Sequence, residues 1–136
     1  MDLSAAQWEA LLAVASSARS QAYAPYSSFA VGAAVLTADG AIHSGCNVEN
    51  LSFGLTVCAE RNAIASAVAG GMRPGGLQAL VVVADTPKPV SPCGACRQVL
   101  MEFAAADCSV LGADLQGRTR CWKMAELLPD GFQAEL

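Results

Sequence analysis

Apolar side chains near the start of the chain recur every three or four residues, at Trp8, Leu11, Leu12 and Ala15. That spacing places them on one face and predicts an amphipathic helix. Ser4, with Gln7 three residues later, forms a capping-box pattern at the start, and Leu3 with Trp8 supplies a hydrophobic staple. The segment 23–26, Tyr-Ala-Pro-Tyr, predicts the end of the helix.

Extended segments follow, and the pattern predicts five strands, at residues 29–37, 41–48, 77–84, 109–114 and 118–122. Asp39-Gly40 lies between the first two strands and predicts a hairpin turn. The run from Leu77 to Ala84 is continuously apolar except for one residue and contains three valines, which is typical of a strand buried on both faces.

Helices are predicted between the strands, at residues 58–69, 94–104 and 124–127. Ile64 and Val68 are four residues apart on one face of the first of these, and Gly70-Gly71 stops it. A hairpin followed by alternating helices and strands predicts an α/β fold. We expect a three-layer α/β/α sandwich in which a mixed five-stranded sheet carries helices on both faces.

The composition is that of one ordinary domain, residues 1–136, with a core of small side chains. Hydrophobic residues make up 54% of the 136, but aromatic residues only 6%. No apolar run approaches the roughly 20 residues needed to span a bilayer. The first residues, Met-Asp-Leu-Ser, lack the basic flank and apolar stretch of a signal peptide, so we expect a cytoplasmic protein with no membrane partner.

The net charge of −4, with no cluster of lysine or arginine, argues against a nucleic-acid partner. Polynucleotide binding draws most of its affinity from neutralised phosphates. The same net negative charge argues mildly against a substrate with several phosphates. A small neutral ligand is more compatible with this charge.

Two short segments carry the candidate chemistry: Cys58-Ala59-Glu60-Arg61, and Pro-Cys-Gly-Ala-Cys-Arg-Gln at residues 92–98. Each lies where a predicted helix begins, and a helix start favours thiolate over thiol. Three thiolates around Zn²⁺ leave a fourth position for water, the arrangement of a catalytic zinc. We expect one zinc ion per chain.

The ligands would be Cys58, Cys93 and Cys96, giving a formal charge of −1 at the site. Arg61 and Arg97 lie beside ligands on the two helices and could offset that charge by hydrogen bonding to sulfur. Glu60 follows Cys58 by two residues, near the metal but without being a ligand. A carboxylate there can take a proton from the activated water, deliver it to a ring nitrogen and later protonate a leaving amine.

A Cys-x-x-Cys pair alone could also be a redox couple or half of a structural zinc knuckle. A structural site would need a fourth ligand, and the other cysteines, at positions 46, 108 and 121, show no ligand spacing. We expect them to behave as small buried hydrophobic residues. His43 is out of phase with the apolar Ile42, which favours a surface or interface position.

Taken together, these motifs resemble the small three-cysteine class of cytidine deaminase over essentially the whole chain. The matching segments are Tyr-Ser-Ser-Phe-Ala-Val-Gly-Ala-Ala at 26–34, Asn-Val-Glu-Asn at 47–50, both cysteine segments, and Glu-Leu-Leu-Pro at 126–129. The resemblance implies hydrolytic deamination of cytidine and 2′-deoxycytidine to uridine and deoxyuridine, with release of ammonia, in pyrimidine salvage. Zinc-dependent nucleobase deaminases use such a glutamate, which is not a ligand, beside a zinc ion that three cysteines can hold.

The resemblance also implies roles for single residues. Asn47 and Glu49 would bind the ribose 3′-hydroxyl, and Phe29 would lie against the pyrimidine ring. The backbone N–H of Ala59 and the carbonyl of Ser91 would help to fix the base. The implied assembly is a homotetramer, in which the aromatic Phe132 would cap a site across a subunit boundary.

The chain departs from the family pattern where Phe53 replaces a usual tyrosine, and the loss of the phenol hydroxyl could weaken a polar contact near the sugar 5′ side or at a subunit interface. Deamination of another cytosine nucleoside such as blasticidin S is an alternative, although the segment 47–50 and the C-terminal residues favour cytidine. A deaminase of nucleotides or polynucleotides fits the acidic balance less well. A non-catalytic zinc-binding module would have no use for Glu60.

Overall fold

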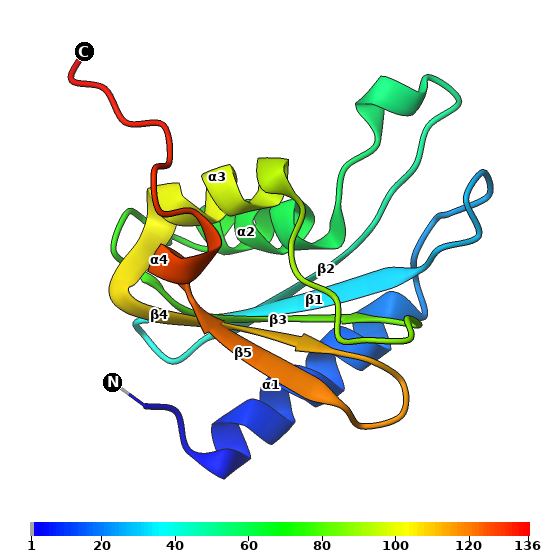
Figure 1. Cartoon of the computed structure of the whole chain (residues 1–136), viewed down its shortest axis with the longest axis horizontal. Helices are drawn as coiled ribbons and strands as arrows, with labels where there is room; N and C mark the ends of the chain where they lie inside the picture. The colour runs from blue at the N-terminus through cyan, green and yellow to red at the C-terminus, as the bar shows by residue number, and fades with distance from the viewer. Residues whose placement is uncertain (1) are drawn as a thin grey trace.

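The structure, a computed structural model, describes residues 2–136 and has a five-stranded sheet at its centre (Figure 1). Its strands are β1 (Val31–Thr37), β2 (Ile42–Cys46), β3 (Leu77–Ala84), β4 (Ala104–Ala113) and β5 (Thr119–Lys123). They lie in the order β2-β1-β3-β4-β5, and β3 and β4 are parallel whereas the other neighbours are antiparallel. The predicted mixed sheet is confirmed.

Helices cover both faces of the sheet, so the predicted three layers are also confirmed (Figure 1). The helices are α1 (Ala5–Arg19), α2 (Ala59–Ala69), α3 (Gly94–Phe103) and the short α4 (Met124–Leu127), with a 3₁₀ turn η1 (Phe53–Leu55). One core lies between the sheet and α1, and the other between the sheet and the remaining helices. Among residues 2–136 no helix is long and apolar enough to cross a membrane.

The central strand β3 explains why the two cores form. Leu80 and Val82 point into the core beneath α2, and Val81 and Val83 point into the core beneath α1. All four are at most 2% exposed, so the prediction of a strand buried on both faces is confirmed.

The capping box predicted for α1 is present. The Ser4 hydroxyl accepts from the Gln7 N–H at 3.2 Å, and the Gln7 side chain accepts from the Ser4 N–H at 2.8 Å. These contacts satisfy two of the donors that a helix start leaves unpaired. The helix ends at Arg19, a few residues before the predicted Tyr-Ala-Pro-Tyr stop.

β4 is longer than predicted, because it begins at Ala104 directly after α3 rather than at residue 109. Three consecutive alanines at 104–106 favour a helix locally. Ala104 nevertheless pairs with Leu77 at the start of β3, and this pairing between distant segments overrides the local preference.

Gly45 in β2 allows α2 to lie directly against the sheet. A Cβ at this position would lie 2.4 Å from the Ala63 nitrogen and 2.5 Å from the Ala59 oxygen, both backbone atoms of α2. Only glycine permits this approach. The contact therefore fixes the position of the first turn of α2, which carries Glu60.

Candidate active site

The three predicted cysteine ligands meet at the starts of two helices. Cys58 is the N-cap of α2, Cys93 is the N-cap of α3, and Cys96 lies in the first turn of α3. Their sulfur atoms all lie within 4.8 Å of one another, with 4.0 Å between Cys58 and Cys93. Tetrahedral zinc with bonds of about 2.3 Å holds sulfurs about 3.8 Å apart, so the cluster fits this metal.

The surroundings of the cluster favour a thiolate at Cys58. The hydrogen bond with Cys96 is the largest cause that lowers the pKa of Cys58, to about 5, and Arg61 lowers it further while burial opposes both. The pKa of Cys96 is raised, because its proton is held by the Cys58 sulfur and because the side chain is buried. Zinc fits this arrangement because it takes up the sulfur lone pairs in place of the shared proton.

The two arginines beside the cysteine ligands, Arg61 and Arg97, have different hydrogen-bond partners. Arg61 Nη2 donates to Cys58 Sγ at 3.2 Å, and Arg61 Nε is buried with no hydrogen-bond partner among the described residues. Arg97 makes no hydrogen bond to sulfur in the described part of the chain, so that prediction is wrong. Its guanidinium donates instead to Pro92 O, Ser91 Oγ and Leu127 O, because it points toward α4 rather than toward the cysteines.

Glu60 lies in the first turn of α2, beside the cysteine cluster, and is only 5% exposed. Burial is the largest cause that raises its pKa, and the negative charge of Cys58 adds to this, while its own backbone N–H acts in the opposite direction. A carboxyl group with a raised pKa can both accept and return a proton near neutral pH.

A cavity of about 280 Å³ opens beside Glu60. Thirteen residues line it: Ser27, Phe29, Val31, Asn47, Glu49, Thr56, Cys58, Ala59, Glu60, Val82, Val90, Ser91 and Cys93. We call this cavity the catalytic cleft. It brings together eight of the residues that the sequence singled out, from four separate segments of the chain.

Asn47 is buried at 7% exposure, and its amide is largely used to hold the cleft wall. The Val31 N–H donates to its side-chain oxygen at 2.9 Å, and its NH₂ group donates to the Phe29 carbonyl at 2.7 Å. The amide thus fixes the segment that carries Phe29, which is 40% exposed and lines the cleft. One N–H of Asn47 remains to donate to a ligand.

Glu49 is held by the loop before β1. One of its carboxylate oxygens accepts from the N–H groups of Tyr26 and Ser27 at 2.9 and 3.1 Å, and the other accepts from the Ser27 hydroxyl. The Ser27 hydroxyl is the largest cause that lowers the pKa of Glu49, against the effect of burial. The side chain is therefore an ionised acceptor on the cleft wall, suited to a hydroxyl group.

Phe132 is the one predicted substrate-binding residue outside the cleft. It is 70% exposed, in the tail beyond α4, and its backbone is held by Gln98 of α3 through bonds of 3.0 and 3.1 Å. Phe53, the departure from the family pattern, is 72% exposed and contacts Tyr26 with ring centroids 5.7 Å apart. The rings of Phe53 and Tyr26 border a cavity of about 270 Å³ that shares Glu49 with the catalytic cleft.

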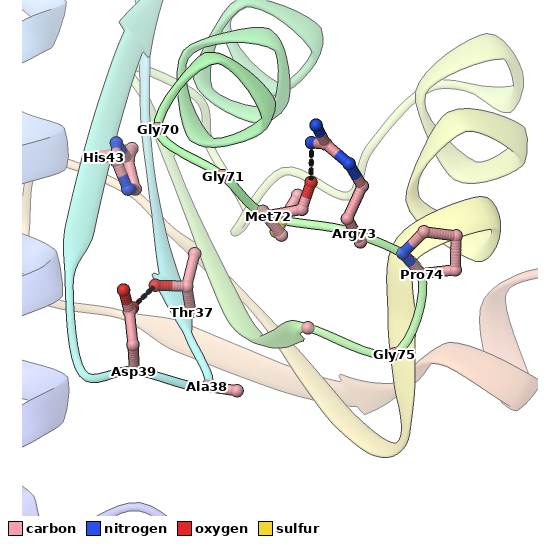
Figure 2. Close-up of a pocket in the computed structure, with 11 residues that line it drawn as sticks. Thr37, Ala38, Asp39, His43, Gly70, Gly71, Met72, Arg73, Pro74 and Gly75 are labelled. Atoms are coloured by element: carbon pink, nitrogen blue, oxygen red, sulfur yellow. Dashed lines mark hydrogen bonds between the residues drawn. The ribbon is translucent and has the colours of Figure 1, made fainter.

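His43 lies away from the cleft, in a cavity of about 390 Å³ at the opposite end of α2 (Figure 2). It is half-buried, and its ring packs against Gly70 so closely that a Cβ there would lie 2.6 Å from His43 Cε1. Asp39 and Arg73 also line this cavity, but Arg73 turns its guanidinium to the carbonyls of Val68 and Met72.

The three cysteines outside the cluster differ in how deeply they are buried. Cys108 is buried, as predicted, and Cys46 is half-buried. Cys121 is exposed, so the prediction of burial is wrong there, because it lies on β5 at the edge of the sheet.

Five cleft residues were not singled out from the sequence: Ser27, Val31, Thr56, Val82 and Val90. Ser27 had a signal, because it belongs to the segment 26–34 that carries Phe29. Val90 precedes Ser91 and could have been included with it. Val82 gives no local signal, because its alternation on β3 is that of any core residue.

Comparisons with known proteins find relatives over most of the chain. The model of the cytidine and deoxycytidylate deaminase zinc-binding region matches residues 5–112. A cytidine deaminase from Sporosarcina psychrophila is 50% identical over 127 residues, 93% of this chain and 92% of that protein. One from Halalkalibacterium halodurans is 50% identical over 125 residues, covering 92% and 93%. The crystal structure of cytidine deaminase from Burkholderia pseudomallei has a TM-score of 0.88 at 51% identity, covering 91% of this chain and 98% of that one.

Proposed function

The chain belongs to the cytidine and deoxycytidylate deaminase family, and we propose that its cleft hydrolyses the 4-amino group of both cytidine and 2′-deoxycytidine, with Glu60 moving the protons. Uridine or deoxyuridine and ammonia are the products. Hydrolytic deamination of cytidine with zinc follows from the family. The observation that carries the residue roles is that Glu60 and two of the clustered cysteines line one cavity.

Cys58, Cys93 and Cys96 would hold the zinc ion, with Arg61 offsetting the thiolate charge. When bound, zinc supplies a Lewis acid that makes a water molecule acidic enough to lose a proton near neutral pH. No fourth cysteine or histidine joins the cluster among the described residues, and the cleft opens beside it.

Glu60 moves two protons in turn in this proposal. Its carboxylate takes a proton from the attacking water and delivers it to N3 of the base, which makes C4 more electrophilic. The water oxygen bonds to C4. Glu60 then takes the proton of the hydroxyl group now on C4 and passes it to the 4-amino group, so that the C4 carbonyl forms as the C4–N bond breaks and ammonia leaves. Burial and the nearby thiolate charge raise the pKa of Glu60, which suits a group that must carry and release protons.

The other cleft residues would bind the nucleoside. The ionised Glu49 accepts from a sugar hydroxyl, and the free N–H of Asn47 donates to the same group. Phe29 lies against the pyrimidine ring. The Ala59 N–H and the Ser91 carbonyl contact the base, whose only donor in cytidine is the 4-amino group.

Glu60→Ala tests the mechanism. The variant should keep one zinc per chain and lose nearly all turnover of cytidine, measured by the ultraviolet absorbance change, because Glu49, the other carboxylate among the described residues that line the cleft, is held by Tyr26 and Ser27. Glu102→Ala, on the α3 surface, is the matched control and should deaminate normally. A Glu60→Ala enzyme within about tenfold of wild type would contradict the mechanism, since general acid–base catalysis typically contributes at least 100-fold.

The proposed assembly is a homotetramer. Large apolar side chains lie exposed on the described surface at Leu51, Phe53, Leu55 and Phe132, each at least 65% accessible. The first three lie on the loop around η1, which projects from the body of the molecule, and Phe132 lies in the extended tail (Figure 1). Exposed apolar groups in this number favour burial against further copies.

A further inference from the structure

The segment that carries Ser91 has no helix or strand of its own. Residues 85–93 connect β3 to α3, and residues 85, 87 and 88 are exposed. Ser91 and Cys93 nevertheless line the catalytic cleft at the end of this connection. Contacts from outside the segment must therefore fix the conformation of its backbone where it lines the cleft.

Arg97 provides that fixation from the first turn of α3. Its Nε donates to the Pro92 carbonyl at 2.6 Å and its Nη2 donates to the Ser91 hydroxyl at 2.9 Å. A planar guanidinium holds both acceptors in one fixed geometry, which a lysine ammonium cannot do. Pro92 is fully buried, so its carbonyl would be left without a donor if the guanidinium were removed.

The third hydrogen bond of Arg97 ties the segment to a distant part of the chain. Nη1 donates to the Leu127 carbonyl at 2.9 Å, in the last turn of α4. Leu127 is 5% exposed and belongs to the core beneath α3 and α4. The guanidinium is thus anchored on the backbone of the buried Leu127, while its other two bonds reach Ser91, which lines the cleft, and the neighbouring Pro92.

We propose that Arg97 is a positioning residue that sets the base-binding end of the cleft by orienting Ser91 and Pro92, and not a partner of the metal-bound sulfurs. The proposal rests on the proposed function, because it assigns the Ser91 carbonyl to the substrate base. A positioning role acts on the binding of the base. A role at sulfur would act on zinc retention and on kcat.

Arg97→Gln should raise KM for cytidine about 10-fold, the loss that one charge-assisted hydrogen bond carries, with a smaller change in kcat per zinc. The variant should retain one zinc per chain. Arg97→Lys should recover part of the loss, because one ammonium can reach only some of the three acceptors. Arg73→Gln is the matched control, since Arg73 also donates to two backbone carbonyls but lies at the far end of α2, and it should keep the wild-type KM.

A double-mutant cycle with Ser91→Ala separates positioning from general stability. That change removes only the hydroxyl acceptor, so the loss in kcat/KM from Arg97→Gln should be smaller in the Ser91→Ala background than in wild type. If the losses in kcat/KM from Arg97→Gln and Ser91→Ala simply add, the proposal is overturned. A wild-type KM in Arg97→Gln would overturn it too. So would a loss of zinc from Arg97→Gln that accounts for the whole fall in its activity.

Amide hydrogen exchange gives a readout that is independent of turnover. Exchange at Val90, Ser91 and Cys93 should accelerate in Arg97→Gln and remain at the wild-type rate in Arg73→Gln. Unchanged exchange in Arg97→Gln would overturn the proposal even if the enzyme is active. A wild-type protein that does not deaminate cytidine would overturn the proposed function, while accelerated exchange would still support the fixation of the segment by Arg97.

Discussion

Replacing Gly112 with alanine would add one methyl group where β4 touches the segment that carries Ser91. The new Cβ would lie 2.0 Å from the Val90 oxygen and 3.0 Å from the Val90 carbonyl carbon. Cβ atoms essentially never lie closer than 3.0 Å to another heavy atom, so the oxygen must move by at least about 1 Å. Val90 and Ser91 both line the cleft, and this movement therefore reaches the substrate.

The size of the effect follows from this displacement. Overpacking of a close contact destabilises the fold by about 1–3 kcal/mol. Misplacing a group that positions substrate by about 1 Å lowers kcat/KM about 100-fold. Gly112→Ala should both destabilise the fold and lower kcat/KM, because the backbone that must move, that of Val90, forms part of the cleft wall.

Gly32→Ala is the matched control for Gly112→Ala. A Cβ at Gly32 would lie 2.0 Å from the Ala15 oxygen, an equally severe backbone contact, but against α1 on the other face of the sheet. Urea unfolding at fixed protein and zinc concentration measures the loss of stability, and steady-state deamination of cytidine measures KM and kcat. We expect similar destabilisation in both variants and the large rise in KM in Gly112→Ala alone. A Gly112→Ala enzyme with wild-type KM would refute the reasoning.

Two further outcomes are expected. Ser27→Ala should raise the pKa of Glu49, whose lowered value contributes stability above its unfolded-state pKa and loses it as pH falls through the folded-state value. The difference in urea unfolding free energy between wild type and Ser27→Ala should therefore be largest near neutral pH and shrink as the pH falls through the lowered pKa of Glu49; a pH-independent difference would contradict this. Light scattering should give a mass of about four chains, and Phe53→Asp, at an exposed apolar position, should lower it. A wild-type monomer would contradict the proposed assembly.

The grouping of the cysteines could be predicted because it depends mostly on local signals. Cys93 and Cys96 are three residues apart at a helix start, which alone places their sulfurs on one side of the first turn. Cys58 begins the other helix, and Gly45 allows α2 to reach the sheet closely enough to join the two starts. The resemblance to a known family then implied that Cys58 binds the same zinc ion as Cys93 and Cys96.

The direction of Arg97 could not be predicted in the same way. One of its acceptors, the Leu127 carbonyl, lies thirty residues further along the chain and is brought near only by the packing of α4. The longer β4 has a similar origin, because Ala104 becomes extended only through pairing with Leu77. In both places a contact between distant segments decides between alternatives that the local sequence leaves open.

The position of His43 bears on the chemistry of the cluster. It is the only histidine in the sequence, and its ring lies against Gly70, where α2 ends, whereas Cys58 lies where α2 begins. The eleven residues of α2 therefore separate the only imidazole from the three sulfurs. This separation supports the proposal that water would take the fourth position on the zinc ion and that Glu60, in the first turn of α2, would move the protons.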